Sequence, residues 1–177
     1  ATGIESGLPS FVRYPRGAGV GVERKEKPET LPIGKAEVLR EGRSCAIWAL
    51  GNFVPVAERI ADQLYSKHGL SVTVTNARFA KPLDENLLFA HARSHDTIIT
   101  LEDNVLTGGF GSAILETLGQ KDLLLPVKRF GWPDQFIEHG NSVSSLRQNH
   151  GLDDQRILSE IEEFLKLDSG CGASLIA

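Results

Sequence analysis

The sequence predicts an α/β protein with a mostly parallel five-stranded sheet and flanking helices. Two observations lead to this fold class. Short apolar or β-branched runs alternate with segments of helical periodicity, which is the pattern of repeated βαβ units. Residues 44–50 are also almost continuously apolar, as expected for a strand that is covered on both faces. We expect right-handed crossovers between the parallel strands.

The first part of the chain differs in composition from the rest. Residues 1–22 contain an expected loop, an extended segment over 11–16 and a glycine-rich stretch. Residues 23–32 are charged and contain two prolines, which predicts a solvated linker and a domain boundary. A short strand is expected over 35–40, and the buried strand over 44–50 follows it.

The middle of the chain continues the alternation. A helix is expected over 54–68, where apolar residues recur every four positions and Gly69 provides a stop. Residues 70–77 are β-branched and alternate in polarity, as a strand does. Asp84 is a suitable N-cap for a helix over 85–92.

The same reasoning predicts the remaining elements, including Asp153 as the N-cap of the last helix. They are strands over 97–102 and 123–130, helices over 113–118, 143–150 and 153–167, and a frayed tail over 168–177.

The composition excludes several classes of protein. The net charge of the 177 residues is −4, which argues against a nucleic-acid partner. No apolar run approaches the roughly 20 residues that span a bilayer, so we expect no membrane segment. Cys45 is predicted to be a buried thiol and Cys171 lies in the tail, so a reducing compartment is expected. The chain has no methionine and starts at Ala1, so we expect a processed product or a fragment.

Two arginines flank a proline near the beginning of the chain. Pro15 and the extended Tyr14 stiffen this segment, and Gly17 allows a turn after it. Arg13 and Arg16 then face opposite ways, so one of them is expected to reach a given site. A rigid guanidinium suits a phosphate or a carboxylate. The alternative is that both arginines are surface charges or pair with nearby acids.

A glycine-rich segment over 108–112 follows the acidic end of a strand, at Glu102 and Asp103. Strand ends and helix N-termini attract anionic ligands, so a nucleotide site is conceivable there. The glycine spacing does not match the dinucleotide fingerprint, however. We therefore favour an interpretation in which the glycines permit close packing.

Other charged residues give weaker signals. Arg78 and Lys81 are expected to pair with acids such as Asp84 or Glu85, although two cations there could also bind an anion. The histidines suggest no site: His91 and His95 have the spacing to face each other on one helix but lack a third ligand, and Glu138 with His139 has no neighbouring nucleophile.

Several motifs, taken together and in order, resemble the 1-deoxy-D-xylulose-5-phosphate synthase family. The resemblance covers about residues 8–166. The motifs lie at residues 13–17, 31–35, 77–84, 102–104, 108–112, 131–140 and 151–153.

This resemblance implies an enzyme that condenses pyruvate with glyceraldehyde 3-phosphate and releases CO₂. The product, 1-deoxy-D-xylulose 5-phosphate, is a precursor of isoprenoids, thiamine and pyridoxal. The family uses thiamine diphosphate and Mg²⁺, which its two earlier domains bind. Residues 1–22 would then be the end of the pyrimidine-binding domain, and residues 33–167 a transketolase C-terminal-like domain.

The resemblance also implies roles for individual residues. Arg16 matches the arginine that binds the phosphate of glyceraldehyde 3-phosphate, Arg13 would brace the segment, and Tyr14 would lie beside the site. No catalytic, cofactor-binding or metal-binding residue is expected in this chain. Alone it should be inactive, because one arginine cannot replace cofactor binding. Its partners would be the N-terminal part of the same enzyme and a second subunit of a homodimer. A bacterial cytoplasm, or a plastid stroma, would be its location.

Two alternatives stay open at this point. The first alternative is that the chain is a fragment of a transketolase or of a 2-oxo-acid dehydrogenase β subunit, because these proteins share this terminal domain. Alternatively, it is a stand-alone regulatory module that binds an anion at the helix start over residues 108–112.

Overall fold

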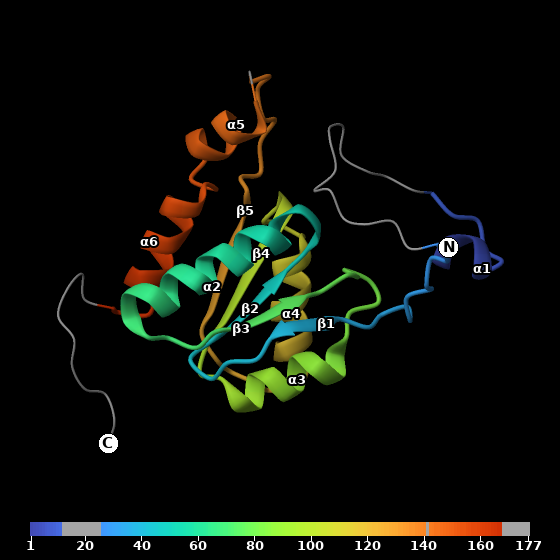
Figure 1. Cartoon of the computed structure of the whole chain (residues 1–177), viewed down its shortest axis with the longest axis horizontal. Helices are drawn as coiled ribbons and strands as arrows, with labels where there is room; N and C mark the ends of the chain where they lie inside the picture. The colour runs from blue at the N-terminus through green and yellow to red at the C-terminus, as the bar shows by residue number, and fades with distance from the viewer. Residues whose placement is uncertain (12–25, 141, 168–177) are drawn as a thin grey trace. The chain divides into compact units, whose positions relative to one another are not determined.

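The computed structural model describes residues 1–11, 26–140 and 142–167. The chain divides into two compact units, Ala1–Ile33 and Gly34–Ala177. Each unit is shown in Figure 1. Most of the predicted extended segment over 11–16, including Arg13, Tyr14 and Arg16, lies outside the described residues. The predicted tail over 168–177, with Cys171, lies outside them too.

The described part of the first unit is small and open. It contains a four-residue helix, α1 (Thr2–Glu5), where the sequence predicted a loop. The Leu31 N–H donates a 2.9 Å hydrogen bond to Thr2 Oγ1. None of the described side chains in this unit is buried, and Phe11 is 99% exposed. Residues 26–32, within the predicted linker, contain no helix or strand and are exposed.

The second unit is built on a five-stranded sheet of order β1-β3-β2-β4-β5. The two edge pairings differ in direction, since β1 runs antiparallel to β3 and the other neighbours are parallel. The mostly parallel sheet of the sequence prediction is therefore confirmed. The strands are β1 (Glu37–Arg40), β2 (Ala46–Ala49), β3 (Thr73–Asn76), β4 (Ile98–Val105) and β5 (Val127–Trp132).

Helices cover both faces of the sheet (Figure 1). Adjacent residues of the central strands point to opposite faces, so Ile47 and Ile99 enter one core cluster while Trp48 and Ile98 enter the other. The first cluster contains α2 (Val54–His68) and α6 (Asp154–Phe164), and the second contains α3 (Glu85–Ser94) and α4 (Phe110–Gly119). The short elements η1 (Gly51–Phe53) and α5 (Val143–Asn149) precede α2 and α6.

Several helix ends follow the local sequence signals. Asp84 accepts a hydrogen bond from the Leu87 N–H and caps α3, as predicted. Asp153 accepts hydrogen bonds from two amides at the start of α6, which confirms the second predicted cap. Gly69 ends α2 in the left-handed conformation that glycine adopts without strain.

Several predicted boundaries were wrong, and two of them are instructive. Helix α4 begins at Phe110, three residues before the predicted start, because its first amides are bound by a distant side chain. Strand β5 begins at Val127, so residues 123–126 are not part of a strand. Leu124 in this connection is 93% exposed, although its apolar side chain suggested burial in the sheet.

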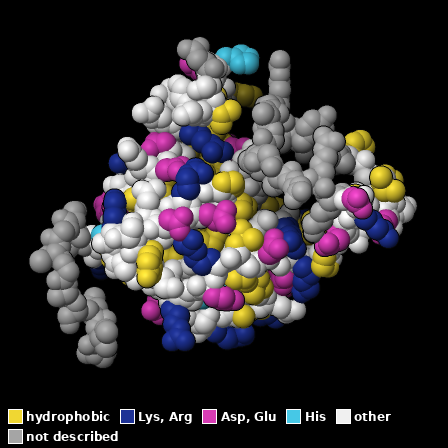
Figure 2. Space-filling view, in the orientation of Figure 1, with side chains coloured by type: hydrophobic (Ala, Val, Ile, Leu, Met, Phe, Trp, Pro, Cys, Tyr) yellow, Lys and Arg dark blue, Asp and Glu magenta, His cyan; other side chains and the backbone are white. Residues whose placement is uncertain are grey.

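The charged surface of the molecule is mixed in sign. Acidic and basic side chains are interspersed over the face seen in Figure 2. Among the described residues, no helix combines the length and apolar character needed to cross a membrane.

A buried chain of polar groups connects α3 with the sheet. The Trp48 indole N–H donates to His91 Nδ1 at 3.1 Å, and the His91 ring packs edge-on against His95. His95 Nε2 lies 2.8 Å from Thr73 Oγ1, which also bonds the backbone of Gly42. The geometry requires an unprotonated Nδ1 on His91. Burial and the neighbouring His95 lower the pKa of His91, against a smaller opposing effect of Glu41.

We expect this buried imidazole to make stability depend on pH. Below about pH 6.5 an unfolded histidine binds a proton. Folded His91 does not until its lowered pKa is reached. The unfolded state then binds more protons, so the free energy of unfolding falls with falling pH in this window.

The measurement is urea denaturation of the chain between pH 5 and 8, chosen around the ordinary histidine pKa of about 6.5. His91→Gln should flatten the pH dependence, because an amide oxygen still accepts from Trp48 and does not titrate. His139→Gln, at an exposed loop position, is the matched control and should leave the slope unchanged. An unaltered slope in His91→Gln would contradict the assignment.

Candidate functional site at the carboxyl edge of the sheet

The carboxyl ends of β2, β4 and β5 carry a connected polar group. The chain leaves β2 in one direction along the sheet to β3 and then crosses back to β4, so β2 and β4 flank a topological switch point. Asp103 accepts hydrogen bonds there from the Asn52 side-chain amide at 3.0 Å and from the Trp132 indole at 2.8 Å. His150 packs edge-on against Trp132. This edge is where a ligand or a partner would meet an open α/β sheet.

A buried carboxylate lies beside this polar group. Glu102 is completely buried in β4 and accepts hydrogen bonds from the backbone N–H groups of Phe110 and Gly111 at 2.6 and 2.8 Å. These amides belong to the start of α4, where negative charge is favourable. Burial raises the pKa of Glu102, while the two backbone hydrogen bonds and the nearby Arg129 act to lower it.

Glycines make room for this carboxylate. A Cβ atom on Gly109 would lie 2.3 Å from Glu102 Oε2 and even closer to the Val105 carbonyl oxygen. A Cβ on Gly131 of β5 would lie 3.0 Å from Glu102 Cγ. Gly111 is crowded in the same way by Thr100 and Arg129. The close-packing interpretation of the glycine-rich segment is therefore confirmed at these positions.

Arg129 and Ser112 complete the surroundings of the α4 start. Arg129 Nη1 donates to Ser112 Oγ at 2.9 Å and to the Leu106 carbonyl oxygen at 3.1 Å. Ser112 Oγ in turn donates to the same carbonyl and accepts from the Gly108 N–H. The donors that an anion would use at this helix start are thus already bound within the protein, which counts against the anion-binding module.

The segment after β3 contains a basic residue, Arg78, in an unusual backbone conformation. Arg78 has φ of 57°, a left-handed conformation that non-glycine residues rarely adopt, and Asn76 Oδ1 accepts from its N–H. Its guanidinium pairs with Glu37 of β1 at 2.6 Å. Arg78 therefore pairs with an acid, as predicted, but this acid is Glu37 and not the suggested Asp84 or Glu85. Asp84 instead binds Lys35 and the Ala36 N–H, because β1 brings those residues beside the α3 cap.

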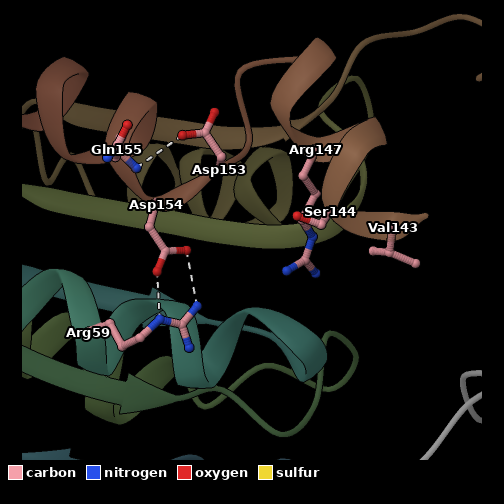
Figure 3. Close-up of a pocket in the computed structure, with 7 residues that line it drawn as sticks. All are labelled: Arg59, Val143, Ser144, Arg147, Asp153, Asp154 and Gln155. Carbon is pink, nitrogen blue, oxygen red and sulfur yellow. Dashed lines mark hydrogen bonds and ion pairs between the residues drawn. The ribbon is translucent and has the colours of Figure 1, made fainter. Parts of the chain in front are cut away.

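A hollow of about 400 Å³ opens between α2, α5 and the start of α6 (Figure 3). Arg59 makes two hydrogen bonds to Asp154 across it, at 2.5 and 3.0 Å. Arg147 lies with its guanidinium carbon 4.2 Å from the centre of the Phe53 ring, as in a cation–π contact. The first pairing connects α6 with α2, and the second connects α5 with η1. We therefore interpret the hollow as a feature of packing between these elements.

A second hollow, of about 370 Å³, lies between the loop after β5 and α5. Phe136, His139 and His150 are among the residues that line it. The loop over residues 133–140 contains no helix or strand, and Phe136 is fully exposed. This loop was noted in the sequence only for its Glu138–His139 pair.

The remaining predicted groups have structural roles or lie outside the description. His91 and His95 bond to Trp48 and Thr73, and no group of three metal-ligating side chains occurs in the described part of the chain. Cys45 is buried, as predicted, and burial raises its pKa to about 12. Arg16, Tyr14 and Arg13 belong to residues that the structure does not describe.

The described sheet and its covering helices define a three-layer α/β domain. Residues 34–157 match the family model described as the transketolase C-terminal domain. The chain therefore belongs to the transketolase C-terminal domain family.

The similarity to known proteins is more specific than this domain family. The chain is 50% identical over 157 residues to the 1-deoxy-D-xylulose-5-phosphate synthase of Thermomicrobium roseum, and 46% identical over 157 residues to that of Acidobacterium capsulatum. Each match covers 89% of this chain and 25% of the relative. The chain thus spans about a quarter of the length of the curated relatives that it matches. The resemblance seen in the motifs is confirmed.

Solved structures agree on the fold. A structure described as a split gene transketolase, inactive beta4 tetramer, superposes with a TM-score of 0.70 at 30% identity, covering 83% of this chain and 48% of that one. The transketolase of Campylobacter jejuni superposes with a TM-score of 0.52 at 18% identity, covering 73% of this chain and 18% of that one. The second likeness shows the fold alone.

A matched pair of glycine substitutions tests the packing around Glu102. Gly109→Ala should lower the free energy of unfolding by about 1–3 kcal/mol, the usual cost of overpacking, because its Cβ has no space. Gly119→Ala, at the end of the same helix, meets nothing within 4 Å and should be neutral or slightly stabilising. Chemical denaturation of the three proteins measures both effects, and equal stabilities would contradict the packing account.

Proposed function

We propose that this chain is the C-terminal part of a 1-deoxy-D-xylulose-5-phosphate synthase. The complete enzyme would condense pyruvate with glyceraldehyde 3-phosphate, with loss of CO₂, to 1-deoxy-D-xylulose 5-phosphate. The observation that carries the proposal is the identity of 46–50% to two such synthases over nearly the whole chain. The product would supply isoprenoid, thiamine and pyridoxal synthesis, and the complete enzyme would be a thiamine diphosphate-dependent transferase.

The architecture of the chain supports the proposal that it is one part of a larger enzyme. The matched relatives are about four times as long as the segment they share with this chain. The described residues of the first unit, Ala1–Ile33, bury none of their side chains. This is expected if residues 1–22 are the end of a pyrimidine-binding domain and residues 33–167 form the assembly domain that follows it.

The described residues offer no place suited to thiamine diphosphate or Mg²⁺. They contain no group of three carboxylates, histidines or cysteines that could hold a metal ion. The amides at the start of α4, which a diphosphate would need, are bound by Glu102. We therefore assign the cofactor and the carbanion chemistry that it supplies to the domains that precede this chain, and we expect no turnover by the chain alone.

Arg16 is the one substrate-binding residue that we propose here. Because Pro15 is expected to stiffen the segment before it, the Arg16 guanidinium would bind the phosphate of glyceraldehyde 3-phosphate in a bidentate manner. Tyr14 would pack or donate a hydrogen bond beside this site, and Arg13 would brace the segment. The partners would be the N-terminal part of the enzyme and a second copy of it, in a bacterial cytoplasm or a plastid stroma.

The proposal is tested with the full-length enzyme that carries this chain at its C-terminus. Purified with thiamine diphosphate and Mg²⁺, it should release CO₂ from pyruvate in proportion to the 1-deoxy-D-xylulose 5-phosphate formed, and only efficiently when glyceraldehyde 3-phosphate is present. Transfer of a two-carbon unit between sugar phosphates, with no decarboxylation of pyruvate, would instead identify a transketolase.

Substitution of Arg16 tests its role. Arg16→Ala in the full-length enzyme should raise the KM for glyceraldehyde 3-phosphate on the order of 10- to 100-fold, since hydrogen bonds to charged groups contribute about 1.5–3 kcal/mol each. The KM for pyruvate should change little. Arg16→Lys keeps the positive charge but loses the forked guanidinium, so its KM for glyceraldehyde 3-phosphate should lie between those of the wild-type enzyme and Arg16→Ala. Unphosphorylated glyceraldehyde is the control substrate, because its use should not depend on Arg16. An equal rise in both KM values would refute the phosphate role.

A further inference from the structure

Among the residues that the structure describes, apolar side chains are exposed at the carboxyl edge of the sheet. The surface that carries them consists of the loop over residues 133–140 and of helix α5, and we call it the loop–α5 surface. Phe136 is fully exposed and Val143 is 63% exposed. Helix α5 buries none of its residues, unlike α2, α3, α4 and α6. Phe136 and Leu146 of α5 line the same hollow of about 370 Å³, together with the polar residues Gln135, Glu138 and His139. Exposed apolar groups that are rimmed by polar residues mark interaction sites in folded proteins.

The loop–α5 surface has little support from the rest of the unit. A seven-residue helix is too short to be stable by itself in water. Its contacts with the rest of the unit include the ring contact of Arg147 with Phe53, and His150 directly after it packs on Trp132. Phe136 is one of the residues that line the 370 Å³ hollow described above. A partner that covers Phe136 and fills this hollow would supply the missing burial.

The topology indicates where the rest of the enzyme joins this unit. Because β1 is antiparallel to β3, with Glu37 opposite Asn76, the amino end of β1 lies at the carboxyl edge of the parallel strands. The Ala36 N–H is bonded to Asp84 at that edge. The polypeptide that precedes Gly34 therefore enters the unit at the same edge as the loop–α5 surface. The matched family is a C-terminal domain, so the other three quarters of the relatives' length precede it.

We infer that the loop–α5 surface docks on the N-terminal part of the same enzyme, with Phe136 as the apolar anchor. This inference rests on the proposed function, because it takes the occupant to be the thiamine-binding part of that enzyme. The opposite edge provides a contrast. Leu124 is 93% exposed in the connection before β5, at the amino edge, and is not expected to be covered by this partner.

The experiment uses the full-length enzyme with a specific protease site introduced at the exposed residues 27–30. After cleavage, the association of the two pieces is measured by native mass spectrometry over a dilution series. Phe136→Asp should weaken the association at least about 10-fold, as loss of a central apolar anchor does. Leu124→Asp adds the same charge to an equally exposed leucine and should change it less than about 2-fold, as expected for a residue outside the interface. Circular dichroism of the C-terminal piece checks that both variants stay folded.

The outcomes separate this inference from the proposed function. Equal association of the Phe136→Asp and wild-type pieces would overturn the docking surface, and so would a Phe136-dependent dimer of the C-terminal piece alone. If the cleaved pieces associate through Phe136 but the uncut enzyme forms no 1-deoxy-D-xylulose 5-phosphate, the surface stands and the proposed reaction fails. If the uncut enzyme is active and Phe136→Asp has no effect on association, the proposed reaction stands and the docking surface fails.

Discussion

The interaction between the Glu102 carboxylate and the first amides of α4 determines how the carboxyl edge of the sheet is built. A fully buried carboxylate at the end of the apolar run of β4 requires compensation, and it obtains this from two backbone N–H groups and the nearby Arg129. Helix α4 must therefore start directly over the end of β4. Gly109 and Gly131 are required where backbone approaches the carboxyl group most closely.

This arrangement has a functional consequence for the domain. The helix start that would attract a phosphate in many α/β proteins is used here to hold the fold together. The polar groups that remain at the edge, Asn52, Asp103 and Trp132, are bonded to one another. In the described part of the domain, the polar groups at this edge are therefore engaged in holding the fold. That character agrees with a role in which the chemistry belongs to preceding domains, and in which the loop–α5 surface contacts them.

Local signals in the sequence predicted much of the fold. Asp84, Asp153 and Gly69 act on amides and carbonyls within a few residues of themselves, so their effects can be read from the sequence. The start of α4 could not be predicted in this way, because it depends on Glu102, which lies eight residues away in another element. The available signal was the acidic end of the strand, at Glu102 and Asp103, directly before the glycine-rich segment. The acid that pairs with Arg78 differed from the suggested ones for the same reason, because the pairing of β1 with β3 brings Glu37 to Arg78.

The candidate site was less predictable than the fold. The motif at residues 13–17 pointed to Arg16 through the stiffness that Pro15 predicts and through its resemblance to a family, but the phosphate role stays a prediction. The polar group of Asp103 and the exposure of Phe136 depend on which strand ends and loops meet at one edge. Such proximity is set by strand order, which the sequence pattern alone does not specify.

The central claim is that this chain contributes binding and assembly but no cofactor chemistry. Isothermal titration calorimetry of the purified 177-residue chain with thiamine diphosphate and Mg²⁺ tests it most directly, followed by an assay for CO₂ release from pyruvate. The account predicts no saturable binding of the cofactor and no turnover, with both gained when the N-terminal part is supplied. Stoichiometric cofactor binding together with CO₂ release by the chain alone would contradict it.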